Sequence, residues 1–168
     1  LTLAETASVF GEMLTFKSIL SNEKNVKEKK ALLANKVEDM LNTVVRQISF
    51  YKFEKEIHLK RKTSELSVEE ICSIWLKKQK ESLGPSIEFD DEYKYYWTYI
   101  PHFIHSPFYV YAYAFGDCLV NSLYGIYEDG LNNFDKKYIT LLESGGSQHY
   151  RLLLKPFNLN PSNTNFWK

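Results

Sequence analysis

The sequence predicts an all-helical protein. Proline is scarce, with none before Pro85, and apolar residues recur every three or four positions for most of the chain. A chain of 168 residues can bury roughly 70% of its unfolded surface, so its stability requires neither a disulfide nor a structural metal. No internal repeat or low-complexity linker is present, which predicts that residues 1–168 form one domain or part of one.

The first sixty residues predict two helices. Thr2 and Glu5 have the spacing of a capping box, in which two side chains pair with the free amides of a helix start. An apolar stripe follows and predicts a helix over residues 3–20. After a polar break, apolar residues at helical spacing, with lysine and glutamate between them, predict a long amphipathic helix over residues 26–61.

A third helix is predicted over residues 67–82. Ser67 and Glu70 form a second capping box, and apolar residues follow them at helical spacing. Gly84 and Pro85 then end the helix, since glycine accepts the backbone of a helix C-terminus and proline cannot continue it.

Aromatic side chains crowd residues 89–115 far more densely than the rest of the chain. Within this segment Ser106 suits an N-cap position, and Pro107 suits the first turn because its missing N–H would be unpaired there anyway. These two residues predict a helix over residues 107–127.

Two short helices and a turn are expected near the C-terminal end. The first helix covers residues 134–142. The second runs through residues 152–154, and Gly145 and Gly146 precede it as its flexible start. Residues 158–168 are expected to form a turn.

The amino-acid composition disfavours several classes of binding partner. Lysine plus arginine and aspartate plus glutamate number 21 each, which disfavours nucleic acid and anionic membranes. There is no run of about 18 apolar residues for a membrane span and no signal-peptide pattern. Cys72 and Cys118 lie in apolar surroundings and are expected to be buried free thiols in a reducing compartment, which predicts the cytoplasm.

Two carboxylates near the N-terminus are candidates for chemistry. Glu5 and Glu12 are seven residues apart, which places them on one face of a helix. The simpler interpretation is a capping role for Glu5 and a solvated Glu12. Glu5 nevertheless lies among small and apolar residues, where a carboxylate needs a hydrogen bond, an ion pair or a metal.

Two histidines lie three residues apart in the aromatic segment. His102 and His105 could share a metal ion on one helical turn, but two ligands are too few for a stable zinc site. The alternative is a pair of histidines hydrogen-bonded within an aromatic core. Motifs for phosphate, dinucleotide, serine-hydrolase and redox sites are absent from the sequence.

Three tyrosines follow these histidines at a spacing of two. Inside a helix, Tyr109, Tyr111 and Tyr113 cannot all face one cleft. At most one or two can offer a hydroxyl that steadies a developing oxyanion, and the others pack in the core. Gly145 and Gly146 can bring backbone N–H groups close to a ligand, or they simply begin a helix.

Three segments, taken in order, resemble one known family. They are LAETAS at residues 3–8 with Glu12, IPHF and PFYVYAYA at residues 100–114, and GGS with LLLKPF at residues 145–157. Together they resemble the C-terminal region of the oligoendopeptidase F family, which belongs with the thimet-oligopeptidase-like zinc metallopeptidases. The resemblance covers almost the whole chain. It implies the helical C-terminal portion of a larger, mostly helical metallopeptidase with a deep substrate cleft.

The resemblance also implies a zinc site. In that family the two histidines of a His-Glu-x-x-His helix and a glutamate on a following helix hold the zinc, and the resemblance places this glutamate at Glu5. Glu12 is similar to a carboxylate that orients the zinc ligands.

The same resemblance assigns residues to the substrate. His102, with Tyr109 or Tyr111, would stabilise the oxyanion, and the resemblance leaves the choice between the two tyrosines open. His105, Gly145 and Gly146 would contact the peptide. Packing is the main role expected of four other aromatic residues of this stretch, Phe103, Phe108, Tyr113 and Phe115.

One departure from the family pattern bears directly on activity. No His-Glu-x-x-His occurs, since none of the four histidines begins or ends one. Two zinc ligands and the general base are therefore absent from this chain. Short peptides and the missing N-terminal part of the same protein are the expected partners, and the chain alone is expected to be inactive.

Two alternatives to a peptidase remain. One is a non-catalytic helical scaffold or peptide-binding protein. The other is an aromatic platform for single-stranded nucleic acid, which the neutral charge and the acidic run Asp90, Asp91 and Glu92 disfavour.

Overall fold

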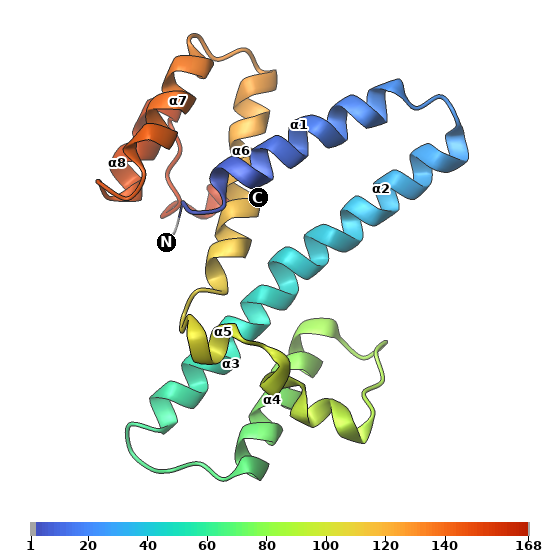
Figure 1. Ribbon diagram of the computed structural model, residues 1–168, viewed down its shortest axis with the longest axis vertical. Coiled ribbons are helices and arrows are strands. Elements are labelled where there is room, and N and C mark those ends of the chain that lie inside the picture. The colour runs from blue at the N-terminus through green and yellow to red at the C-terminus, as the bar shows by residue number, and fades with distance from the viewer. Residues whose placement is uncertain (1–2, 168) are drawn as a thin grey trace. The chain divides into compact units, whose positions relative to one another are not determined.

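The computed structural model describes residues 3–167 (Figure 1). Helical segments make up most of this range, and no strand occurs within it. The predicted all-α class is confirmed. The chain divides into two compact units, and the expectation that residues 1–168 form one domain or part of one stays a prediction. The terminal unit comprises Leu1–Glu38 and Phe115–Lys168, and the central unit comprises Asp39–Ala114.

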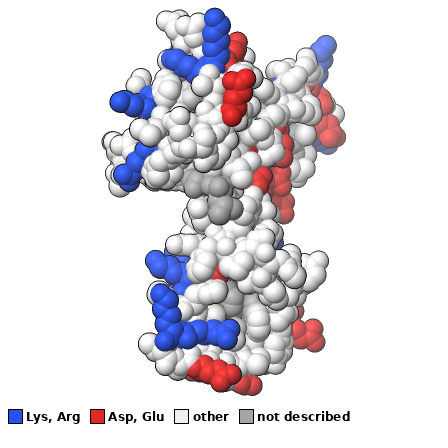
Figure 2. Space-filling model, turned by 60° about the vertical axis from the view of Figure 1, so that its left-hand side comes forward, with Lys and Arg blue, Asp and Glu red and all other residues white. Residues whose placement is uncertain are grey.

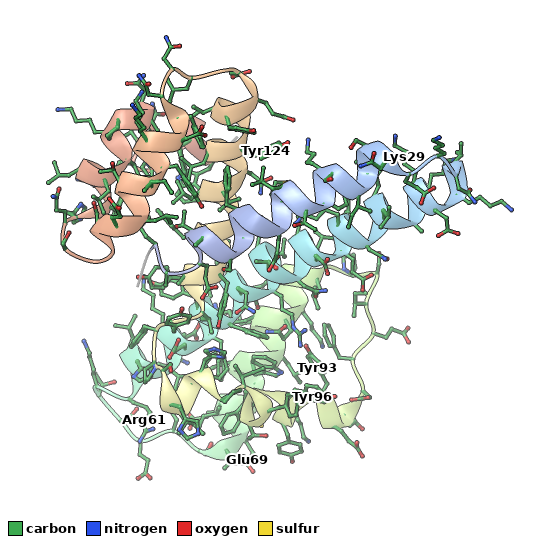
Figure 3. All side chains as sticks on the ribbon, turned by 45° about the horizontal axis from the view of Figure 1, so that its top comes forward. Lys29, Arg61, Glu69, Tyr93, Tyr96 and Tyr124 are labelled. Atoms are coloured by element: carbon green, nitrogen blue, oxygen red, sulfur yellow. The ribbon has the colours of Figure 1, made fainter. Side chains whose placement is uncertain are left out.

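The terminal unit combines both ends of the chain. It contains α1 (Thr6–Asn22), most of α2 (Val26–Met40) and of α6 (Tyr111–Glu128), α7 (Phe134–Ser144), α8 (Tyr150–Leu154) and two 3-10 turns at Lys155–Phe157 and Thr164–Trp167. Its core gathers around Phe10, whose ring lies 4.6 Å from that of Tyr138 and 5.9 Å from that of Phe134. The ring of Tyr124, on α6, lies 6.2 Å from that of Phe10 (Figure 3).

The central unit has its own aromatic core. It contains the π-helical segment η1 (Leu41–Arg46), α3 (Gln47–Lys60), α4 (Val68–Leu83), the 3-10 segment η2 (Asp91–Tyr99) and α5 (His102–His105). Trp75 on α4 is fully buried, and its ring lies 5.4 Å from Phe50 and 5.2 Å from Phe53, both on α3. The Trp75 indole N–H donates to the backbone carbonyl of Tyr93. The ring of Tyr93 stacks on that of Tyr96 (Figure 3).

Two predicted helices are confirmed. The backbone is helical from Val26 to Lys60, as the long periodic segment predicts, although the six residues of η1 are wound as a π-helix. The capping box of α4 is also present. The Ser67 Oγ accepts from the Glu70 amide at 3.2 Å, and the Glu70 carboxylate accepts from the Ser67 amide at 2.8 Å.

The first helix begins later than predicted. α1 starts at Thr6, and Glu5 occupies the N-cap position without a side-chain capping hydrogen bond. The backbone before it forms a turn, with the Thr6 amide donating to the carbonyl of Leu3. Thr2, the other half of the predicted capping box, lies outside the described residues.

The helix predicted over residues 107–127 is wrong at its start. α6 begins at Tyr111, and Ser106 is the C-cap of α5 and not an N-cap. The reason is Phe108, whose φ of +59° is left-handed and cannot belong to a right-handed helix. Tyr109 therefore precedes the helix, so it shares no helical spacing with Tyr111.

The glycine pair ends a helix and does not open one. Gly145 is the C-cap of α7, at a φ of +48° that glycine tolerates, and its amide donates to the carbonyl of Leu142. α8 begins five residues later, with His149 as N-cap. The expected turn over residues 158–168 contains the 3-10 segment at Thr164–Trp167.

The cysteines and the lengths of the helices bear on two further expectations. Both cysteines are free thiols, with Cys72 buried as predicted and Cys118 only half-buried. Across residues 3–167, no helix combines the length and apolar character that crossing a bilayer requires.

Candidate functional site

His102 and two tyrosines form a contact cluster in the central unit. The His102 Nε2 lies 3.1 Å from the Tyr113 hydroxyl, and the two rings meet edge to face. The ring of Tyr109 lies nearly parallel to the imidazole, with centroids 6.0 Å apart and 19° between planes. The Tyr109 and Tyr113 rings also contact each other, at 5.3 Å. One imidazole thus contacts two phenol rings, which also contact each other.

The other predicted donor, Tyr111, contacts a different ring. It meets Tyr51 of α3 edge to face, with centroids 5.9 Å apart. The sequence left Tyr109 and Tyr111 open and assigned Tyr113 to packing, whereas the structure brings the Tyr113 hydroxyl to His102. No local signal indicates this contact, because Tyr109 lies before α6 and the turn at Phe108 decides how the tyrosines meet His102.

His105 is the last residue of α5 and is exposed. Within residues 3–167, no group of three or more histidine, cysteine or acidic side chains could hold a metal ion. The predicted contact of His105 with the substrate stays a prediction.

Glu5 stands at the start of α1 in the terminal unit, half-buried. The Ser8 hydroxyl donates to the Glu5 carboxylate at 3.3 Å and lies 3.1 Å from its backbone carbonyl. Gly116 on α6 lies directly against it, because a Cβ at this position would come within 3.0 Å of the Glu5 Cβ. Sequence reasoning missed Gly116, since a glycine inside a helix gives no local sign of the partner that it admits.

Glu12 is exposed on the same helix, and its charge acts on another acid, Asp117. Burial raises the pKa of the Asp117 carboxyl on α6. Lys36 opposes this effect, and the negative charge of Glu12 adds to it. Asp117 is almost completely buried and accepts a hydrogen bond from the side chain of Asn121. The charges of Glu12 and Lys36 thus act on the buried Asp117 in opposite directions.

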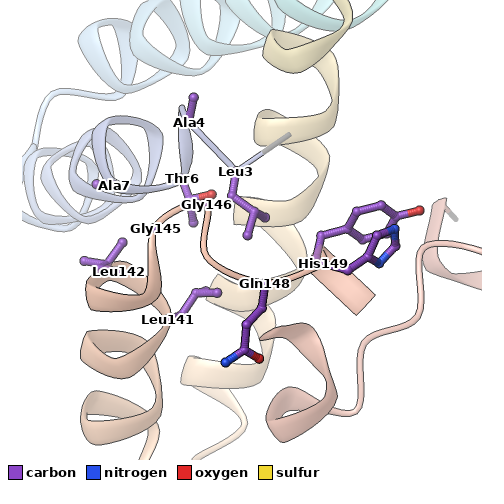
Figure 4. Close-up of a pocket in the computed structure, with 11 residues that line it drawn as sticks. Leu3, Ala4, Thr6, Ala7, Leu141, Leu142, Gly145, Gly146, Gln148 and His149 are labelled. Atoms are coloured by element: carbon purple, nitrogen blue, oxygen red, sulfur yellow. The ribbon is translucent and has the colours of Figure 1, made fainter. Parts of the chain in front are cut away.

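A pocket of about 640 Å³ lies in the terminal unit, beside the start of α1 (Figure 4). Its walls come from residues on both sides of Glu5, from the end of α7 and from the following loop: Leu3, Ala4, Thr6, Ala7, Leu141, Leu142, Gly145, Gly146, Gln148, His149 and Tyr150. The structure therefore brings the predicted glycine pair close to the segment that carries the predicted zinc ligand. Thr6 is buried here, and its hydroxyl has no hydrogen-bond partner.

The described residues do not by themselves make a zinc site. Glu5 supplies one carboxylate, and no second and third ligand gather with it in the part of the chain that the structure describes. Four-coordinate zinc requires at least three protein ligands in a catalytic site. Any zinc bound at Glu5 would need ligands from outside this chain.

Comparison with known proteins gives one consistent result. The profile of Peptidase family M3 matches residues 1–168. The chain is 33% identical over 147 residues to an oligoendopeptidase F homolog of Borreliella burgdorferi, covering 87% of this chain and 25% of that protein. It is also 33% identical over 149 residues to oligopeptidase PepF of Bacillus subtilis, covering 88% and 22%. The chain spans about a quarter of the length of these curated relatives.

Two solved structures share the fold. The crystal structure of oligoendopeptidase-F from Enterococcus faecium matches with a TM-score of 0.85 at 26% identity, over 98% of this chain and 32% of that one. A putative peptidase from Chlamydophila abortus matches with a TM-score of 0.84 at 31% identity, over 99% and 28%. From the profile match, the sequence identities and the shared fold it follows that the chain belongs to peptidase family M3, where its relatives are oligoendopeptidases of the F type.

Proposed function

We propose that this chain forms the C-terminal part of the catalytic domain of a zinc-dependent oligoendopeptidase that hydrolyses short peptides. The supporting observation is the contact of the His102 imidazole with both Tyr109 and Tyr113, in a segment that resembles the family's oxyanion-stabilising region. Membership of peptidase family M3 supports the reaction class.

The cluster has the chemistry to stabilise a developing negative charge. An imidazole N–H and a phenol O–H are hydrogen-bond donors, and donors fixed in advance stabilise an oxyanion without reorganising. The His102 to Tyr113 contact of 3.1 Å restrains the imidazole. In the proposed reaction, His102 and one tyrosine donate to the carbonyl oxygen of the scissile peptide bond.

The loop after α7 supplies space for the substrate backbone. A Cβ at Gly145 or Gly146 would meet no atom within 4 Å, so the backbone is open on that side. An extended peptide can approach such a backbone closely. We propose that these glycines, with His105, contact the peptide.

The zinc of the proposed enzyme is only partly accounted for by this chain. Glu5 would supply one carboxylate ligand, and a His-Glu-x-x-His segment outside the chain would supply two histidines. When bound, zinc polarises a carbonyl and activates a water. Glu12 would orient the zinc ligands and would not contact the substrate.

Phenylalanine variants of the three tyrosines test the oxyanion role in the longest natural form of the protein. Removal of one oxyanion donor lowers kcat by about 10² to 10³, with KM changed much less. Tyr109→Phe, Tyr111→Phe and Tyr113→Phe are compared, with Tyr95→Phe as a control because Tyr95 is half exposed on the surface. One variant of the three should show the full loss.

The alternative is a non-catalytic helical scaffold or peptide-binding protein. It predicts that His102→Ala and Glu5→Gln leave hydrolysis unchanged, or that the longest natural form hydrolyses no peptide. Either result would refute the proposed peptidase function, provided that circular dichroism shows the variants to be correctly folded.

We propose further that the protein works in the cytoplasm without nucleic acid or a membrane as partner. Free cysteines favour a reducing compartment. The net charge is zero, and Figure 2 shows basic groups interspersed with acidic and uncharged ones on the visible face. Cell fractionation and an oligonucleotide binding assay at low salt test the two statements.

A further inference from the structure

Glu54 is a buried acid in the central unit that the proposed reaction does not use. It lies on α3, next to the core residue Phe53, and is only 2% exposed. No lysine or arginine pairs with it within residues 3–167, and His58 and His102 are the two bases whose charges act on it. A buried carboxyl without a cation is costly, so this position requires an explanation.

One oxygen of this carboxyl is used by the backbone of a distant turn. The Glu54 Oε1 accepts from the Phe108 amide at 2.7 Å, a short distance typical of a bond to a charged acceptor. The bond joins α3 to the connection between α5 and α6, across 54 residues of sequence. Oε2 is buried and has no hydrogen-bond partner, so burial raises the pKa of Glu54 in spite of this bond and of the two histidines.

The residue that receives this support has an unfavourable backbone. Phe108 has a φ of +59°, and a bulky side chain in the left-handed region persists only where its surroundings hold it. Two contacts do so here. One is the bond to Glu54, and the other is the ring of His58, whose centroid lies 4.7 Å from that of Phe108.

This turn connects the parts of the His102 cluster. His102 lies on α5 before the turn, Tyr109 follows Phe108 directly, and Tyr113 lies in the first part of α6. The Tyr109 amide donates to the carbonyl of Ser106, which closes the turn. The direction in which the chain leaves Phe108 therefore sets how the two phenols meet the imidazole.

We infer that Glu54 is a positioning residue, whose carboxyl holds the Phe108 turn and thereby fixes Tyr109 and Tyr113 against His102. Its consequence for catalysis rests on the proposed function, whereas the restraint of the turn does not. In this role Glu54 acts through the backbone of Phe108, beside the direct charge interaction between its carboxyl and His102.

Two variants of similar size separate the hydrogen bond from packing. Glu54→Gln keeps an oxygen that can accept from the Phe108 amide, and Glu54→Leu fills the site but leaves that amide without a partner. In the longest natural form, Glu54→Leu should lower kcat by roughly 10-fold to 100-fold with KM within about 2-fold, because small displacements of catalytic groups have such effects. Glu54→Gln should keep kcat within about 3-fold of the wild-type value, because its side chain can still accept from the Phe108 amide.

Hydrogen exchange measured by mass spectrometry tests the turn without reference to activity. Peptides over residues 103–112 should exchange at least about tenfold faster in Glu54→Leu than in the wild type, with peptides of α4 unchanged. Unchanged exchange and unchanged kcat in Glu54→Leu would overturn the inference. Equal losses in Glu54→Gln and Glu54→Leu would overturn it as well, since the acceptor would then not matter.

The two hypotheses fail in different ways. If the wild type hydrolyses no peptide but the turn opens in Glu54→Leu, the proposed function is wrong and the restraint of the turn stands. If Glu54→Leu does not fold, Glu54→Asp takes its place, because it keeps the charge and withdraws the oxygen by one methylene. Wild-type exchange over residues 103–112 in Glu54→Asp would contradict the inference.

Discussion

At the scale of single residues, the buried Glu54 links stability to pH. Burial raises the pKa of its carboxyl above the usual 4.5, more than the Phe108 amide and the two histidines lower it. Between the unfolded and the folded pKa the native state holds more protons than the unfolded state. The free energy of unfolding therefore falls as pH rises through that window.

Glu54→Gln removes this titration. We expect the variant to gain stability relative to the wild type as pH rises above about 4.5, and the difference to level off above the folded pKa. The gain in the free energy of unfolding is about 1.4 kcal/mol for each pKa unit by which folding raises the pKa of Glu54. Urea denaturation from about pH 4 to about pH 8 measures it, and a stability difference that stays constant with pH would contradict the expected rise.

Gly116 is a second residue whose role depends on a close approach. Alanine in a helix interior is favoured over glycine by up to about 1 kcal/mol. We expect this gain for Gly125→Ala, where a Cβ meets no atom within 4 Å, and not for Gly116→Ala, where it lies 3.0 Å from the Glu5 Cβ. Both glycines belong to α6, so Gly125→Ala is a matched control for Gly116→Ala.

The same pair of variants tests the role of Glu5. In the longest natural form, Gly116→Ala displaces Glu5 and should lower zinc affinity about tenfold, as loss of a residue that orients a ligand does. Gly125→Ala should leave the affinity unchanged. Competition with a zinc-binding dye gives the affinities. Equal zinc affinities for the two variants would show that Gly116 does not position Glu5 as a zinc ligand.

At the scale of helices, the start of α4 depends on a local signal. Ser67 and Glu70 satisfy each other's amides, and loss of an N-cap serine costs about 1 kcal/mol. Ser67→Ala should lower the free energy of unfolding by that amount. Ser73→Ala is the control, because the Ser73 hydroxyl bonds only to the carbonyl of Glu69 one turn earlier and alanine suits a helix interior. Equal effects in urea denaturation would show that the cap contributes nothing.

Elements with local signals were predictable from the sequence. The capping box of Ser67 and the three-to-four spacing of residues 26–61 depend on neighbours a few positions away, and both predictions are confirmed. The start of α6 was not predictable in this way. Phe108 leaves the helical region because Glu54, 54 residues earlier, and the His58 ring hold it, and no local pattern contains those partners.

The candidate site shows the same division. The sequence predicts a chemical role for the segment from His102 to Tyr113, but which phenol reaches His102 depends on the turn at Phe108. The glycine pair was noticed, yet it ends α7 and lines the pocket beside Glu5, an arrangement that requires the folded terminal unit. The sequence thus predicts candidate residues, and tertiary packing decides which side chains they contact.

At the scale of the whole molecule, the proposed chemistry is distributed over more than this chain. The chain spans about a quarter of the curated relatives, and its described residues include one predicted zinc ligand and no group of three. We therefore expect the purified 168-residue chain to show no peptide hydrolysis, and the longest natural form to show hydrolysis that a chelator abolishes and added zinc restores.

A quenched fluorescent oligopeptide measures both preparations, and inductively coupled plasma mass spectrometry gives their zinc content. Glu5→Gln in the longer form should lower zinc content and activity together, since it exchanges a carboxylate ligand for a weaker amide. Glu12→Gln should change them less, because an orienting residue acts through its ligands. Chelator-sensitive hydrolysis by the 168-residue chain alone would contradict the proposed division of the site, because catalytic zinc requires more ligands than Glu5 supplies.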